Sequence, residues 1–135
     1  MQSKKNILSL FERDIASRNL GIEIKNISEN SVTLTMKVID SMIQGHGVCH
    51  GGYLFLLADT AMAFASSKVG GANLAMSANI DFVRPALKDQ LLTAVAKEVV
   101  QSKRTGLYDV RVYNDNESLV CHFRGRTIRA TRMSE

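Results

Sequence analysis

One segment constrains the fold of this chain more than any other. Residues 53–68, with the sequence YLFLLADTAMAFASSK, are apolar on nearly every face. Their alanines, leucines and methionine favour an α-helix, and a helix that is apolar all round must be enclosed by other elements. The chain has 135 residues, enough for one domain, so a sheet wrapped around this helix is the simplest enclosure. Gly70 and Gly71 are expected to end the helix.

Alternating apolar and polar residues predict β-strands before and after this helix. The expected strands lie near residues 22–27, 32–38, 74–82, 91–100, 108–113 and 119–126. Short turns between neighbours indicate an antiparallel sheet of five or six strands, and hence an α+β fold. One helix cannot cover both faces of such a sheet, and the nearly continuous apolar run at 91–100 indicates a second covered surface. A homo-oligomer would provide that cover most simply.

The two ends of the chain carry weaker signals. Apolar residues recur at helical spacing over 5–19, which predicts a short N-terminal helix within residues 1–19. No linker or internal repeat divides the chain, so residues 1–135 are predicted to form a single domain. Residues 129–135 are expected to form a basic tail that could be flexible. Basic residues are densest toward this end, at Arg124, Arg126, Arg129 and Arg132, and a solvated surface is their simplest interpretation.

Composition excludes several classes of protein. Apolar residues make up 45% and charged residues 22% of the chain, as in a typical globular domain. No apolar stretch reaches the ~18 residues of a membrane span, and the first apolar run is too short for a signal peptide, so we expect a cytoplasmic protein without a membrane partner.

The net charge of +4 suits a nucleic acid, an anionic membrane or a polyanionic small molecule. Scattered basic residues and the lack of a nucleic-acid-binding motif argue against a nucleic-acid partner.

The residues that could carry chemistry lie in a glycine-rich loop at 44–52, with the sequence QGHGVCHGG. A loop of this length in a small domain is usually functional. One interpretation is a zinc site formed by His46, Cys49 and His50, although no fourth ligand is evident. Another is a cysteine hydrolase with Cys49 as nucleophile, although a histidine directly after the cysteine does not face it. Cys49 and Cys121 alone do not make a disulfide framework.

A third interpretation uses the backbone at the start of the apolar helix. If the helix begins near Gly51 and Gly52, its first N–H groups are free donors, and the helix dipole adds partial positive charge. A carbonyl oxygen placed there would be polarised, as in an oxyanion hole. The same helix carries Asp59, whose carboxylate costs free energy in apolar surroundings unless it is paired or functional. It could be a base or nucleophile for hydrolysis, or it could be satisfied by Thr60 or a nearby backbone group.

The spacing of these two groups predicts a dimer. Gly51 and Asp59 are eight residues apart, which corresponds to about 12 Å along a helix. One ester carbonyl cannot touch both groups in the same chain. The two act together only if a second subunit brings its acid to the first subunit's glycine, so the site is expected at a subunit interface.

Together with the order of elements, these residues are similar to those of the phenylacetic acid degradation thioesterases, which have the hot-dog fold. The similar segments, within roughly residues 15–128, are Gly45-His46, Cys49-His50-Gly51-Gly52, Leu57-Ala58-Asp59-Thr60, Ile80-Asp81-Phe82-Val83-Arg84-Pro85, Thr105-Gly106-Leu107-Tyr108-Asp109 and Phe123-Arg124-Gly125. The resemblance implies a curved antiparallel sheet of five to six strands around one long central helix, with a short N-terminal helix. It also implies hydrolysis of an acyl-CoA thioester, with an aryl group such as phenylacetyl or hydroxyphenylacetyl, to the free acid and CoA.

The resemblance also assigns roles to residues. Gly51 would bind the thioester carbonyl through its N–H, and Asp59 of the partner subunit would activate water or attack directly. The expected substrate-binding residues are Gln44, His50, Gly52, Ser77 and Arg84. Gln44 stands where the family usually has Asn, which bears on the acyl preference more than on the reaction. Lys103 and Arg104 are further candidates to contact the CoA nucleotide.

We expect the chain to assemble as a dimer of dimers, which is a homotetramer. No metal or bound cofactor is required, because CoA is part of the substrate. The alternatives are a thioesterase for medium-chain, hydroxybenzoyl or quinone-pathway CoA esters, a hot-dog hydratase, and a non-catalytic module that binds acyl-CoA.

Overall fold

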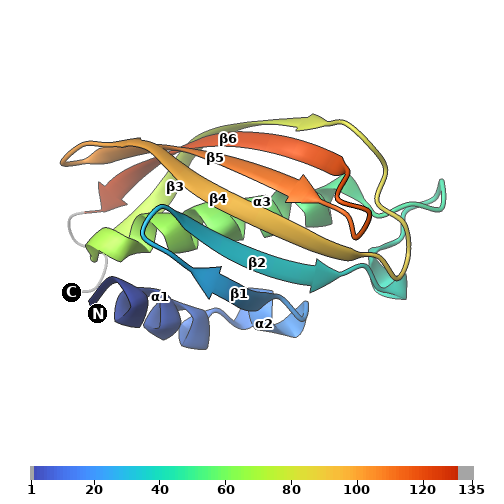
Figure 1. Cartoon of the computed structure of the whole chain (residues 1–135), viewed down its shortest axis with the longest axis horizontal. Coiled ribbons are helices and arrows are strands. Elements are labelled where there is room, and N and C mark those ends of the chain that lie inside the picture. The colour runs from blue at the N-terminus through green and yellow to red at the C-terminus, as the bar shows by residue number, and fades with distance from the viewer. Residues whose placement is uncertain (1, 131–135) are drawn as a thin grey trace.

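The computed structural model describes residues 2–130, which form one curved antiparallel sheet packed on a long helix (Figure 1). The elements in chain order are α1 (Gln2–Arg13), α2 (Ile15–Asn19), β1 (Glu23–Ile27), β2 (Ser31–Lys37), η1 (Asp40–Met42), α3 (Gly51–Ser66), η2 (Ser67–Val69), β3 (Ala72–Phe82), β4 (Leu91–Gln101), β5 (Thr105–Tyr113) and β6 (Leu119–Ala130). The six strands lie in the order β1-β2-β4-β5-β6-β3, and each pairs with its neighbours in antiparallel fashion. The predicted α+β arrangement, with a curved sheet around one central helix, is confirmed.

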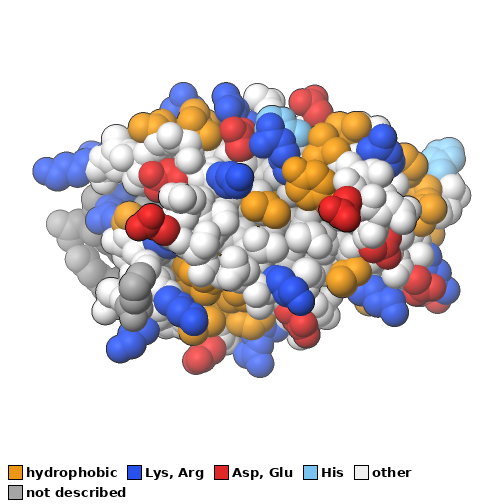
Figure 2. Space-filling view, in the orientation of Figure 1, with side chains coloured by type: hydrophobic (Ala, Val, Ile, Leu, Met, Phe, Trp, Pro, Cys, Tyr) orange, Lys and Arg blue, Asp and Glu red, His pale blue; other side chains and the backbone are white. Residues whose placement is uncertain are grey.

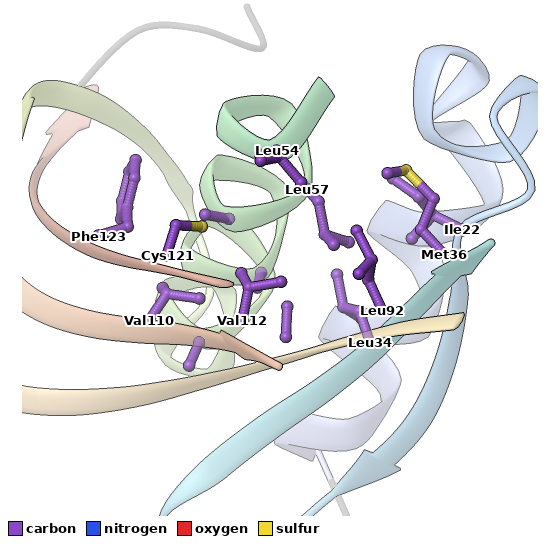
Figure 3. Close-up of a cluster of buried hydrophobic side chains, with 14 of the residues drawn as sticks. Ile22, Leu34, Met36, Leu54, Leu57, Leu92, Val110, Val112, Cys121 and Phe123 are labelled. Carbon is purple, nitrogen blue, oxygen red and sulfur yellow. The ribbon is translucent and has the colours of Figure 1, made fainter. Parts of the chain in front are cut away.

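Helix α3 is enclosed because its residues are apolar on most faces, as the sequence indicates. Its buried residues include Leu54, Leu57, Ala61 and Met62. Figure 3 shows side chains of α3 facing a layer of side chains from β2, β4, β5 and β6. Sheet and helix approach closely at Gly125, where a Cβ atom would lie 2.5 Å from Met62 Sδ. The helix gives way to the short η2 turn, which Gly70 (φ +78°) ends.

The N-terminal segment differs from the prediction of one helix, because it breaks into two helices at Asp14. The carboxylate of Asp14 accepts a hydrogen bond from Ser17 N at 3.0 Å and so caps α2. Aspartate is a preferred N-cap residue, and here its cap starts a new helix. The Ser17 hydroxyl also bonds Asp14, at 2.7 Å, and lies 3.4 Å from the Thr60 hydroxyl of α3. This contact joins α2 to the middle of α3.

The predicted tail begins later than expected, because β6 continues to Ala130. Arg129 donates its backbone N–H to Arg104 O at 2.8 Å, and its guanidinium donates to Gly70 O at 3.2 Å. The prediction is therefore wrong for residues 129 and 130, where strand pairing and the carbonyls after α3 hold the chain. Residues 131–135 lie outside the described residues.

Strand β3 forms an uncovered edge of the sheet. It pairs with β6 on one side, and no strand among residues 2–130 pairs with its other side. Apolar side chains on this 11-residue strand and just after it are exposed, namely Leu74, Met76, Phe82 and Val83. An exposed apolar edge of this kind favours pairing with another chain. Within the same residues, no helix has the length and apolar character needed to cross a membrane.

Candidate active site

The start of α3 leaves one backbone donor free. His50 is the N-cap residue, and its Nδ1 accepts a hydrogen bond from Gly52 N at 2.9 Å. The His50 carbonyl accepts from Tyr53 N at 3.0 Å. Gly51 N–H, by contrast, has no acceptor among the described residues. It therefore remains available to a ligand, at the positive end of the helix dipole.

Backbone hydrogen bonds fix the loop that leads into this helix. Gln44 N donates to Val48 O at 2.8 Å, and Gly47 N donates to Gln44 O at 2.9 Å, which closes a tight turn. Gly47 has a φ of +86°, a conformation that glycine adopts without strain. The Gln44 side-chain oxygen accepts from His46 N, so its NH₂ group is left without an acceptor among residues 2–130. Cys49 N donates to Ala86 O at 2.8 Å and ties the loop to the segment after β3.

A pocket of about 350 Å³ lies at this end of α3. Its size is at the small end of the range for ligand sites. Apolar side chains make up most of its wall, and Gln44, Gly51 and Arg84 provide polar groups. The lining residues are Gln44, Val48, Cys49, Gly51, Leu54, Phe82, Val83, Arg84 and Pro85. The structure thus brings three of the predicted site residues together around one cavity.

Phe82 is a pocket residue that the sequence did not single out. Its ring lies so close to Gly51 that a Cβ atom on the glycine would be 3.1 Å from Phe82 Cζ. In the sequence, Phe82 continues the alternation of Ile80 and looks like an ordinary inward-facing strand residue. In the structure, the side chain of Phe82 is exposed. Its position just before Arg84-Pro85, where the strand ends, is the signal that could have marked it.

Asp59 lies on the same helix but does not line this pocket. Its side chain is half-buried, and burial raises its pKa above the ordinary aspartate value. Among the described residues, no hydrogen bond or ion pair reaches its carboxylate. The Thr60 hydroxyl, which could have satisfied it, faces Ser17 instead. Within one chain, Asp59 is therefore an uncompensated acid, which has a free-energy cost.

Two other interpretations of the glycine-rich loop find no support. Burial raises the pKa of the Cys49 thiol to about 11, and the thiol donates to His50 O at 3.6 Å, so it is a poor nucleophile at neutral pH. His46, Cys49 and His50 do not come together as metal ligands, since residues 2–130 contain no cluster of three such side chains. His50 Nδ1 is already occupied by the helix cap.

The remaining predicted residues are distributed over the molecule. The Gly52 N–H, predicted to bind substrate, already donates to His50. Arg84 is exposed at the pocket wall and donates through Nη1 to Leu119 O at 2.5 Å. Ser77 is exposed on the edge strand β3, next to a bulge, and does not line the pocket.

Lys103 and Arg104 lie at the opposite end of the molecule from Gly51. They occupy the hairpin between β4 and β5, which is near the C-terminal end of α3 (Figure 1). The 16 residues of α3 separate the two ends, by about 24 Å. One chain therefore does not bring Arg84 and Arg104 together. On the face that Figure 2 shows, basic side chains are spread among acidic ones.

The fold and this helix-terminal site define a class of protein, and comparison with known proteins supports the same class. A family model described as the thioesterase superfamily matches residues 46–121. This chain belongs to the thioesterase superfamily. Acyl-coenzyme A thioesterase PaaI of Escherichia coli (strain K12) is similar, with 41% identity over 125 residues that cover 93% of this chain and 89% of the relative.

Two solved structures extend the comparison. The structure of the E. coli PaaI protein from the phenylacetic acid degradation operon matches with a TM-score of 0.93 and 40% sequence identity. The match covers 96% of this chain and 94% of the E. coli chain. A hypothetical thioesterase from Streptococcus pneumoniae TIGR4, solved with coenzyme A, matches with a TM-score of 0.77 and 27% sequence identity. The match covers 81% of this chain and 88% of the S. pneumoniae chain. The predicted hot-dog fold, thioesterase class and resemblance to phenylacetic acid degradation thioesterases are confirmed.

Proposed function

We propose that this chain hydrolyses acyl-CoA thioesters, preferentially those with an aryl group such as phenylacetyl or hydroxyphenylacetyl, to the free acid and CoA. The observation that carries the proposal is the unpartnered N–H of Gly51, at the start of α3 and on the wall of an apolar pocket. Thioester hydrolysis develops negative charge on the carbonyl oxygen, and a fixed backbone donor stabilises that charge. The similarity to acyl-coenzyme A thioesterase PaaI supports the same substrate class.

In the proposed reaction, the thioester oxygen accepts hydrogen bonds from Gly51 N–H and from the free NH₂ group of Gln44. Water adds to the carbonyl carbon while the Asp59 carboxylate takes its proton. The tetrahedral oxyanion then re-forms the C=O bond and expels the CoA thiolate, which takes up the proton held by Asp59. If Asp59 attacks instead, an anhydride forms, and water hydrolyses it to the same acid. Both routes require Asp59 in its ionised form.

We place the acid in the partner subunit. Eight residues of helix, or about 12 Å, separate Gly51 from Asp59 in one chain, and Asp59 does not line the Gly51 pocket. The uncovered apolar edge of β3 supports a dimer through that edge. In such a dimer, the Gly51 pocket of each chain would receive Asp59 from the other chain. Two-fold symmetry would then give two equivalent sites. Pairing of two such dimers would give the predicted homotetramer.

The other predicted residues support binding. His50 caps α3 and so holds the Gly51 backbone in place, while Gly52 leaves room for the His50 ring, since a Cβ there would lie 3.1 Å from His50 Nδ1. Arg84 is exposed at the pocket, and its guanidinium suits the phosphates of CoA. Ser77, on the β3 edge, would orient the attacking water only across the subunit interface. The proposal needs no metal and no cofactor besides the substrate's own CoA.

A thiol-release assay over a panel of acyl-CoA esters tests this function. We expect phenylacetyl-CoA to be hydrolysed faster than butyryl- or octanoyl-CoA. Asp59→Asn should lower kcat by ~100-fold or more, the usual effect of losing a general base, and Glu12→Gln, which alters an exposed acid of α1, should not. A preference for octanoyl- or hydroxybenzoyl-CoA would reassign the acyl group. Binding of acyl-CoA without release of CoA would identify a non-catalytic module and contradict the proposal.

A further inference from the structure

The Phe82 ring lies against Gly51, the residue whose N–H would bind the substrate carbonyl. A Cβ atom built on Gly51 would lie 3.1 Å from Phe82 Cζ and 3.2 Å from Cε1, so the ring rests on the glycine itself. Any side chain at Gly51 would push the ring away. A carbonyl that accepts a hydrogen bond from Gly51 N–H must come within about 3 Å of that nitrogen. A carbonyl bound at Gly51 would therefore lie close to the Phe82 ring, on the wall of the same pocket.

We propose that Phe82 is a specificity-determining residue of the pocket. Its ring covers Gly51 in the free protein, turns aside when the thioester carbonyl reaches the Gly51 N–H, and then packs against the acyl group. This inference rests on the function proposed above and adds the group that recognises the acyl part of the substrate.

The surroundings of Phe82 allow this movement. Its backbone is held in the sheet, where β3 pairs with β6 at Phe82 and Cys121. In a single chain its side chain is 56% exposed, so rotation about the side-chain bonds does not disrupt the core of that chain. The ring can therefore leave Gly51 while the strand stays in place.

The composition of the pocket explains why the ring would favour an aryl group. Among the described residues that line the pocket, Phe82 is the one aromatic side chain, and Val48, Leu54, Val83 and Pro85 supply aliphatic surface. Aromatic pairs gain energy beyond area burial in edge-to-face and offset arrangements. An aliphatic acyl group gains only burial from the same wall. Phe82 should thus make the protein prefer aryl over aliphatic acyl-CoA substrates.

The first test measures the ratio of kcat/KM for phenylacetyl-CoA to kcat/KM for butyryl-CoA. Phe82→Leu keeps apolar volume but removes the aromatic face, and we expect the ratio to fall roughly tenfold. Phe82→Ala should lower it at least as far. Leu87→Ala, which shortens another exposed apolar side chain outside the pocket, is the matched control and should leave the ratio unchanged. The native size of each variant is checked by gel filtration with light scattering.

An unchanged ratio in Phe82→Leu, at native size and with measurable wild-type activity, would overturn the inference. If the wild-type protein neither binds nor hydrolyses any acyl-CoA, the proposed function itself fails, so the two failures are distinguishable. A second readout follows ring movement. The chain contains no tryptophan, so Phe82→Trp introduces a single tryptophan that can be excited apart from the tyrosines. Its emission should change saturably with a non-hydrolysable thioether analogue of phenylacetyl-CoA, and constant emission during calorimetrically measured binding would contradict the movement.

Discussion

At the scale of single residues, Gly51 combines two properties, its small size and its free backbone N–H. It is small enough to accept the Phe82 ring, and its N–H has no acceptor among residues 2–130, because Gly51 is the first residue of α3. Proline is tolerated at this helix position, since its fixed φ suits the first turn and its missing N–H is an orphan there. His50, with φ −61° and ψ +133°, already has the extended backbone that a following proline requires. The two properties can therefore be tested separately.

We expect Gly51→Ala and Gly51→Pro to differ sharply in activity. Both place a Cβ atom against Phe82, but only proline removes the donor. Loss of one oxyanion-hole donor typically lowers kcat by ~100-fold or more, so Gly51→Pro should show a loss of that size, and Gly51→Ala a much smaller one that falls mainly on KM. The measurement is steady-state hydrolysis of phenylacetyl-CoA. Equal kcat values for the two variants would exclude the N–H from catalysis.

Asp59 gives the second prediction at this scale, a dependence on pH. Because burial raises its pKa, the acid limb of the profile of kcat against pH should lie above about pH 4, the ordinary range for aspartate.

The same shift in the pKa of Asp59 affects stability. The folded state favours the protonated form, so the unfavourable contribution of Asp59 is largest at neutral pH and fades as pH falls through the folded pKa. Asp59→Asn should thus raise the Tm at pH 7, with a gain that shrinks toward pH 4. A lower Tm for this variant at pH 7 would show that the carboxylate is compensated in the folded protein.

At the scale of elements, the long helix and the strands could be predicted from periodic patterns in the sequence, but the residues at which several elements begin or end could not. The apolar run at 53–68 and the alternation of strands such as 32–38 predict α3 and the sheet, because packing against one core enforces those patterns. The break at Asp14 and the extension of β6 to Ala130 depend on a few local hydrogen bonds and strand pairs. The helix N-cap shows the same limit: the sequence placed the start of α3 near Gly51, but histidine is not a residue that normally signals a cap.

The His50 cap yields a prediction about this element. His50→Ala removes the acceptor for Gly52 N–H and should lower the free energy of unfolding by about 1 kcal/mol, the usual effect of a lost cap. His50→Asn restores a good cap residue and should recover most of that loss. Urea denaturation of both variants measures the difference. His46→Ala, which changes an exposed histidine of the same loop, should have little effect. A His50→Ala variant as stable as the wild type would show that the cap is energetically unimportant.

At the scale of the whole molecule, a single chain holds the carbonyl site and the acid in separate places. Gln44, Gly51 and Arg84, which the resemblance assigns to the site, line one pocket. Asp59 does not line that pocket and has no partner among residues 2–130, and the β3 edge is uncovered within the same residues. The sequence could indicate this division through helix spacing alone. It could not reveal the contact of Phe82 with Gly51, because that contact joins the end of a strand to the start of a helix 31 residues earlier in the chain.

The most direct test of the shared site is complementation between two inactive variants. Gly51→Pro lacks the donor, and Asp59→Asn lacks the acid, so each should be inactive alone. In a mixed dimer, one of the two sites combines the intact Gly51 of one chain with the intact Asp59 of the other. Equal co-expression, with random pairing, should therefore restore about a quarter of wild-type activity toward phenylacetyl-CoA. If the mixed oligomer forms but remains as inactive as its parents, each site lies within one chain, and the account is contradicted.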